Sequence, residues 1–182
     1  MQALSPMIFL YVILAGMGLG LIGYFILIYN HFIELYQNTQ KAWANIDVLL
    51  KQRHDELAML SQVVMQYAEY EQELFSQLNM IRHHCEKARS TQQLVELNQQ
   101  ETLLQQLTLQ LLGLVERYPA LKTNQNYLKA VERISMLEKI IADRREFYNE
   151  TVNCYNVRLE SFPDVFISKS FGFLPATLLE FK

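Results

Sequence analysis

Residues 7–29 form an uncharged, almost wholly apolar run of 23 residues, MIFLYVILAGMGLGLIGYFILIY. At ~1.5 Å per residue, a helix of this length spans about 34 Å, which is enough to cross a hydrocarbon core of ~30 Å. The run leads into residues 24–112, a stretch of 89 residues that contains neither Gly nor Pro. Together the two features predict a membrane helix that continues into long helical rods.

The apolar run differs from a cleaved signal peptide. Residues 1–6 carry no Lys or Arg, the run exceeds the usual 7–15 apolar residues, and no small-x-small cleavage site follows it before Asn30. We therefore expect a retained, single-pass anchor. Lys41 and Arg53 follow the run and no positive residue precedes it, so the positive-inside rule favours a cytoplasmic C-terminal domain.

Glycines cluster within the run. Gly16 and Gly20 stand four residues apart, a spacing that lets two membrane helices approach closely, and Gly23 follows on the same face. Glycine is also common in membrane helices without any such role. We interpret the three glycines as a surface for association between membrane helices.

Beyond the run, apolar residues recur at steps of three and four, which predicts amphipathic helices. We expect a first helix continuing from the anchor to about residue 90, a second from a capping box at Ser90–Gln93 to about residue 117, and a third over residues 125–161. Pro119 breaks the chain, and Asn124 is a good cap for the third helix.

These patterns predict an all-α fold, in which an N-terminal transmembrane helix continues into an antiparallel bundle of three to four long helices. A bend in the first helix would give the fourth. We expect three regions: an anchor at residues 1–30, a helical bundle at residues 31–163 and a Phe-rich tail at residues 164–182 that packs on the bundle.

Composition excludes some functions. A net charge of −3 and a pI near 5.8 argue against binding to nucleic acid. Cys85 and Cys154 both lie in helical patterns, and we expect two buried free thiols, with an extracytoplasmic disulfide as the alternative.

Four charged residues interrupt the apolar stripes. Counting by threes and fours places Arg53 and Glu71 in the stripe of the first helix, and Glu138 and Arg145 in that of the third. Because an unpaired buried charge is costly, we expect these residues to pair in a structural network. The alternative is a polar site in the bundle core. A di-iron site is not indicated, because Glu-x-x-His does not occur.

Other motifs give no sign of catalysis or of a cofactor. Adjacent residues of a helix point about 100° apart, so His83, His84 and Cys85 cannot bind one metal ion from one face. There is no Gly-rich phosphate loop and no His-Glu-x-x-His. We expect no enzyme, no cofactor and no metal site.

Two Tyr-Asn pairs stand one heptad apart, Tyr148-Asn149 and Tyr155-Asn156. A buried Tyr needs a partner for its hydroxyl, and Asn offers both a donor and an acceptor. We expect a polar ladder that fixes the register of the third helix and belongs to the structural network.

The sequence resembles the LemA family over nearly its whole length. The resemblance rests on Ala42-Trp43-Ala44-Asn45-Ile46-Asp47-Val48, on Glu116-Arg117-Tyr118-Pro119-Ala120-Leu121-Lys122, on the two Tyr-Asn pairs, on Phe162-Pro163 and on Phe171-Gly172-Phe173. It departs where the family usually reads Leu-Ile-Pro-Asn-Leu and this chain has Glu56-Leu57-Ala58-Met59-Leu60, and where Lys139 replaces an Asn.

The resemblance implies a bacterial cytoplasmic (inner) membrane protein with a helical bundle on the cytoplasmic side, and brings no established enzymatic activity. Some family members are associated with the formation of membrane-bound organelles, and others are suspected to accompany membrane zinc metalloproteases. Our first hypothesis is a self-associating scaffold or adaptor, whose partners are the lipid bilayer, further copies of itself and such a metalloprotease or another membrane protein. The alternative is a lipid-contacting protein that shapes membranes, based on the Phe-rich tail. An enzyme using the buried Arg/Glu set ranks third.

Overall fold

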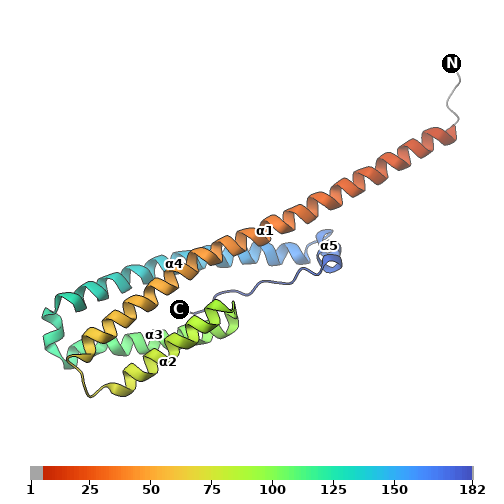
Figure 1. Ribbon diagram of the computed structural model, residues 1–182. Helices are drawn as coiled ribbons and strands as arrows, with labels where there is room; N and C mark the ends of the chain where they lie inside the picture. Colours follow the sequence, from red (N-terminus) through yellow and green to blue (C-terminus); the bar gives the residue numbers. More distant parts are fainter. Residues whose placement is uncertain (1–5, 182) are drawn as a thin grey trace. The chain divides into compact units, whose positions relative to one another are not determined.

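A computed structural model describes residues 6–181, and these residues form an all-α fold (Figure 1). The elements in chain order are α1 (Pro6–Met65), α2 (Gln72–Ser90), α3 (Leu94–Arg117), the short 3-10 helix η1 (Pro119–Thr123), α4 (Gln125–Glu160) and α5 (Asp164–Phe171). The predicted fold, a long apolar N-terminal helix followed by a bundle, is confirmed. The first five residues of the predicted anchor and Lys182 lie outside the described residues.

The chain divides into two compact units. The first, here called the anchor unit, combines the described part of Met1–Thr39 with Asn153–Ala176. The second, the bundle unit, combines Gln40–Val152 with the described part of Thr177–Lys182. Both α1 and α4 contribute residues to each unit.

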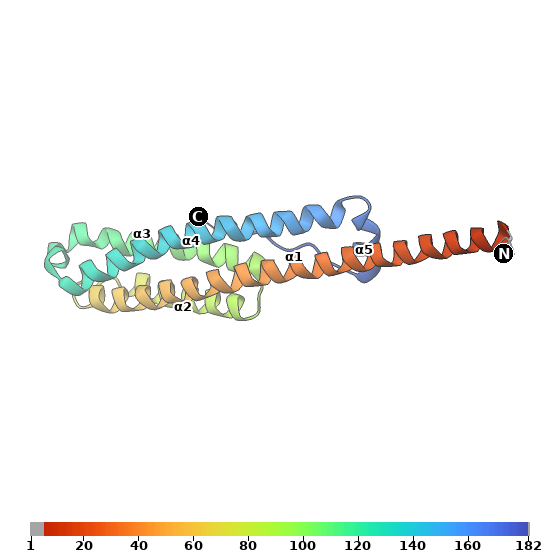
Figure 2. The same cartoon turned by 90° about the horizontal axis from the view of Figure 1, so that it is seen from above.

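In the bundle unit, neighbouring helices run antiparallel, as both ribbon views show (Figures 1 and 2). Short connections between α2, α3 and α4 enforce this topology. Each helix turns one apolar stripe inward, and the fully buried side chains follow helical spacing: Ile46, Leu50, Leu57 and Leu60 on α1, Leu78 on α2, and Leu97, Leu104, Leu111 and Leu114 on α3.

The predicted continuous helix to residue 90 is wrong, because α1 ends at Met65 and α2 begins at Gln72. The chain turns there without Gly or Pro, and the backbone N–H groups of Tyr67 and Ala68 both donate to the carbonyl of Val64. The turn lets the stripe of α2 pack in the core instead of extending into solvent. The bundle therefore has the fourth helix that a bend would give.

The predicted capping box at Ser90–Gln93 is also wrong. These residues end α2 in a Schellman motif: the N–H of Gln93 donates to Ala88 O at 2.9 Å, and that of Gln92 donates to Arg89 O at 3.2 Å. Gln92 adopts the left-handed conformation that glycine usually fills, with φ of 53°. By contrast, the predicted cap of α4 is confirmed, since Asn124 Oδ1 accepts the N–H groups of Asn126 and Tyr127.

The anchor unit has its own small core, which consists of Ile28, Phe32, Tyr155, Leu159 and Ile167. The Phe-rich tail joins this core through aromatic contacts: the ring centroids of Tyr29 and Phe171 lie 4.9 Å apart, and those of Phe32 and Phe173 lie 5.2 Å apart. Helix α5 ends at Phe171, and the next residue, Gly172, has a φ of 72°, which allows the chain to turn away from the helix.

Among the described residues, α1 is the one helix long and apolar enough to cross a membrane. Large apolar side chains between Met7 and Leu27 are exposed on every side of this segment. Gly16, Gly20 and Gly23 have no described neighbour within 4 Å of the position that a Cβ would take. Their predicted role in helix association stays a prediction.

Candidate functional site

The polar centre of the bundle unit is built around Arg53, a buried residue of α1. One guanidinium nitrogen donates to Oε2 of Glu101 on α3, and the other donates to Oε1 of Glu138 on α4 at 3.0 Å. Glu101 is 1 % exposed, whereas Glu138 reaches the edge of the bundle. The arginine therefore ties three helices together through two carboxylates.

His54, the next residue of α1, reaches the same carboxylate. Its Nε2 lies 2.9 Å from Oε1 of Glu101, so both oxygens of this buried glutamate have a partner. Burial disfavours the charged form of Glu101. The charge of Arg53 and the hydrogen bond with His54 outweigh this cost and hold the pKa of Glu101 below its usual value.

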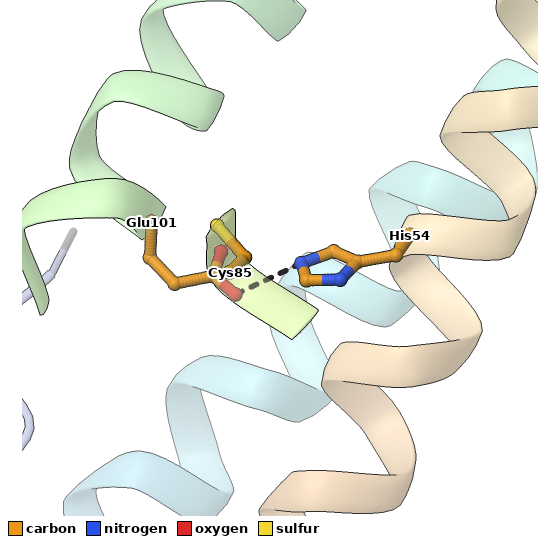
Figure 3. A group of neighbouring side chains, drawn as sticks. All are labelled: His54, Cys85 and Glu101. Carbon is orange, nitrogen blue, oxygen red and sulfur yellow. Dashed lines mark hydrogen bonds and ion pairs between the residues drawn. The ribbon is translucent and has the colours of Figure 1, made fainter. Parts of the chain in front are cut away.

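Cys85 completes the cluster from α2. Figure 3 shows its thiol beside His54 and Glu101, and the candidate ligand atoms of the three residues all lie within 4.8 Å of one another. All three side chains are buried, and burial raises the pKa of the Cys85 thiol well above its usual value. We call His54, Cys85 and Glu101 the HCE cluster; with Arg53 and Glu138 it draws on all four helices of the bundle.

A polar cavity of about 180 Å³ adjoins the cluster. His54 belongs to both, while the other lining residues come from α1 and α2: Lys51, Asp55, Asn79, Arg82, His83, Glu86 and Arg89. An ion pair between Arg89 and Asp47, at 2.8 Å, lies at the same two helices. Of the HCE cluster, His54 lines this cavity, whereas Cys85 and Glu101 do not.

The structure brings together only half of the predicted Arg/Glu network. Arg53 and Glu138 pair, but Glu71 lies in the turn between α1 and α2, where a continuous helix was expected, and it pairs with Arg117 at 2.8 Å. Arg145 lies over the ring of Phe181, 5.5 Å from its centroid. A predicted set of four thus falls into three separate interactions.

Sequence reasoning missed His54 and Glu101. Glu101 had a signal, because the stripe of α3 steps from Leu97 to Leu104 and leaves the intermediate inward position to residue 101. His54 had none of its own, because it neighbours Arg53 and lies outside the apolar stripe of the first helix. In the structure both residues contact Glu101. His83 and His84 are exposed, whereas Cys85 between α1 and α3 is buried.

The two Tyr-Asn pairs hold the tail, and the expected ladder within the third helix is wrong. In the bundle unit, Asn149 forms two hydrogen bonds with the backbone of Leu179, both of 2.9 Å, and the Tyr148 hydroxyl donates to the carbonyl of Thr177. Asn98 of α3, which sequence reasoning missed, donates to the carbonyl of Leu178.

The anchor unit repeats this arrangement. Asn156 donates to the carbonyl of Ala176 at 2.9 Å and accepts its N–H at 2.8 Å, while the Tyr155 hydroxyl donates to Leu174 O at 3.1 Å. An extended tail cannot satisfy its own backbone groups, and an Asn side chain supplies one donor and one acceptor. The Asn side chains therefore supply the hydrogen bonds that a neighbouring strand would supply in a β-sheet.

The two cysteines have different environments. Both are free, as expected, and Cys85 is buried, but Cys154 is exposed, so the expectation of two buried thiols is wrong for the second. Cys154 lies next to Tyr155 on α4, where the inward position belongs to the tyrosine.

Comparison with known proteins gives a family and two named relatives. A sequence model described as the LemA family matches residues 42–182. Magnetosome protein MamQ 2 of Paramagnetospirillum magneticum is 23% identical over 177 residues, covering 85% of this chain and 65% of that protein. Magnetosome protein MamQ of Magnetospirillum gryphiswaldense is 21% identical over 174 residues, covering 80% and 62%. The chain thus spans a little under two thirds of the length of these relatives.

Proposed function

The chain belongs to the LemA family, and from that premise we propose that it is a membrane-anchored helical scaffold or adaptor. In this proposal it self-associates and organises or assists another membrane protein, for which a membrane zinc metalloprotease is one candidate. The observation that carries the proposal is α1, a single helix of 60 residues that includes both the apolar segment and the first helix of the bundle. The same helix thus supplies residues to the apolar segment and to the bundle.

The surface of the bundle unit supports a protein partner. A groove of about 320 Å³ lies on α3 and α4, with Leu109, Leu112, Val131 and Ile134 among its lining residues. Leu109 itself is 64% exposed. Apolar surface of this kind commonly marks sites of association.

Self-association is tested by measuring the mass of the full-length protein, extracted in mild detergent, by light scattering. We expect a homo-oligomer that becomes smaller when Gly16 and Gly20 are both replaced by Leu, because the larger side chains separate the helices. Gly18→Leu is the matched control, since residue 18 lies on the opposite face of the helix. An unchanged mass in the double variant would rule out this face as the contact.

The adaptor role is tested by mass spectrometry of the same particle. A second membrane protein present in fixed stoichiometry supports the role, and its identity names the process. A particle that contains only this chain, also after chemical cross-linking in cells, would contradict it.

We further propose a single-pass topology in a bacterial cytoplasmic membrane, with the bundle on the cytoplasmic side. Cys154 provides a natural probe, because its thiol is exposed while that of Cys85 is buried. A membrane-impermeant maleimide should label Cys154 only after the cells are permeabilised. Labelling in intact cells, absent in Cys154→Ser, would reverse the topology.

Contact with lipid is a second candidate function, favoured by α5. Phe162, Phe166 and Phe171 are 63% exposed or more, although the same unit packs Ile167 against Ile28 and Phe32. Ile28 lies at the end of the apolar segment of α1, and Phe32 lies one turn beyond it. Exposed aromatic side chains at this level fit the interface of a bilayer.

The lipid contact can be measured by fluorescence. In a Trp43→Phe background, which removes the only tryptophan, Phe166→Trp should be quenched by brominated lipids in proteoliposomes. Phe147→Trp, at an exposed position of the bundle unit, is the control and should not be quenched. Equal quenching at the two positions, or none at either, would argue against a specific contact of α5.

A further inference from the structure

We propose that the HCE cluster is a zinc-binding site, with His54, Cys85 and Glu101 as its protein ligands. The three residues offer one imidazole nitrogen, one thiol sulfur and one carboxylate oxygen, which are the three ligand types that Zn²⁺ uses in proteins. They come from α1, α2 and α3, so a bound ion would link three helices. The sulfur ligand argues against Mg²⁺ and Ca²⁺, which prefer oxygen.

The spacing of the ligand atoms is suitable. Bonds of about 2.0–2.3 Å in a tetrahedral zinc site place ligand atoms about 3.3–3.6 Å apart. His54 Nε2 and Glu101 Oε1 lie 2.9 Å apart, and all three atoms lie within 4.8 Å of one another. Small side-chain rotations would therefore close the cluster on an ion without moving a helix.

The surroundings hold the ligands in place. Arg53 donates to Oε2 of Glu101 and leaves Oε1 directed at His54, while Glu138 fixes the other side of the guanidinium. Partners of this kind orient metal ligands in known sites. Because Oε2 of Glu101 is paired with Arg53, only Oε1 is available to bind the ion.

The cavity beside His54 meets the proposed site through His54 alone, because Cys85 and Glu101 do not line it. Its volume of about 180 Å³ holds water, and its lining is mostly charged. A Zn²⁺ ion with three protein ligands keeps one position open, which a water molecule fills. The ion would reach the cluster past the His54 side chain, and binding would release the proton of the Cys85 thiol to solvent, because the thiolate is the form that binds zinc.

The formal charge of the HCE cluster, taken together with Arg53 and Glu138, favours the binding of a cation. Arg53 contributes +1 and Glu101 and Glu138 contribute −1 each, so the hydrogen-bonded set sums to −1 when the imidazole and the thiol are counted as neutral. Zn²⁺ together with a Cys85 thiolate adds +1 and brings the sum to zero. Buried charges are tolerated best when they are balanced.

The test uses the full-length protein in detergent, stripped with a chelator and then titrated with Zn²⁺ alone. We expect one ion per chain by elemental analysis and calorimetry. Cys85→Ser should weaken binding at least tenfold, whereas Cys154→Ser, which removes the other, exposed thiol, should bind as the wild type does. Co²⁺ should give a thiolate-to-metal charge-transfer band that is lost only in Cys85→Ser.

A measurement on the wild type keeps the test valid even if Cys85→Ser does not fold. X-ray absorption of the zinc-loaded protein should show one sulfur ligand and a remainder of nitrogen and oxygen ligands. Three outcomes overturn the proposal: no retained zinc, a zinc shell without sulfur, or equal affinity in a folded Cys85→Ser protein.

Discussion

Asn149 binds the backbone of Leu179 on both of its polar groups: the side-chain Nδ2 donates to the carbonyl oxygen, and Oδ1 accepts the amide N–H, each at 2.9 Å. A helix thereby holds an extended segment in the way that one strand holds another. Asn149 of α4 thus helps to fix the position of a segment that lies 30 residues further along the chain.

Asn149→Ala should lower the free energy of unfolding by roughly 1–3 kcal/mol, because two hydrogen bonds are lost and the backbone groups of Leu179 lose their partners. Denaturant unfolding of the full chain measures this change. Asn153→Ala, an exposed position on the same helix, should change stability by less than about 0.5 kcal/mol. Similar effects at the two positions would show that the tail adds little to stability.

Arg53→Met should lower the free energy of unfolding by about 3–5 kcal/mol, because it leaves the buried carboxylate of Glu101 without the cation that it pairs with. Replacing both residues, Arg53→Met with Glu101→Leu, should recover a large part of the loss. Arg117→Met, which removes the exposed partner of Glu71, should cost no more than about 1 kcal/mol. Thermal or denaturant unfolding of the wild type, of Arg53→Met, Glu101→Leu and Arg117→Met, and of the double variant gives the comparison. Additive losses in the double variant would exclude a direct coupling.

Glu101 should make the protein sensitive to acid. Its pKa is lower in the folded protein than in the unfolded chain, so its contribution is complete above the ordinary glutamate value of about 4.3 and is lost as the pH falls from there through the folded pKa. Stability measured between pH 6 and about pH 3 should therefore decline less steeply in Glu101→Gln. An unchanged slope in Glu101→Gln would mean that another group controls the decline.

Tyr148 should make the protein sensitive to alkali. Burial raises its pKa to about 12, so the unfolded chain loses this proton first, from about pH 10 upward. The contribution of Tyr148 is complete below pH 10 and declines as the pH rises to about 12. Tyr148→Phe should flatten the decline in that window, and an unchanged slope would mean that another group controls it.

Gln92→Gly should stabilise the protein by up to about 1 kcal/mol. Gln92 is exposed and has a positive φ, which costs a residue with a Cβ more than it costs glycine. A thermal melt should show a rise of a few degrees. Thr91→Gly next to it, at φ of −94°, is the control and should lower stability instead.

The sequence predicted the helices best where their ends carry specific residues. The helix expected at residues 125–161 is α4, Gln125–Glu160, because Asn124 caps its start and Pro163 follows its end. The turn after Met65 has no Gly or Pro, and it forms because α2 packs against the rest of the bundle. Tertiary packing of this kind leaves no mark in the local sequence.

The site was predicted only in part for a related reason. Periodicity placed Arg53 and Glu138 in inward-facing stripes, and they do meet. It cannot say which residue of another helix lies opposite, so the pairing of Arg53 with Glu101 was not visible. The role of Asn149 was equally hidden, because its partner is the backbone of a segment with no regular structure of its own.

The amide groups that hold the tail recognise main chain rather than side chains. Asn149 forms hydrogen bonds with the N–H and C=O of Leu179. In the bundle unit the buried side chains of the segment are Leu179 and Phe181, whereas those of Thr177, Leu178 and Glu180 are exposed. The side chains of Thr177, Leu178 and Glu180 can therefore be changed while the hydrogen bonds that hold the backbone of the segment remain. A charged or aromatic recognition motif at these three exposed positions would leave the contacts between the segment and α4 unchanged.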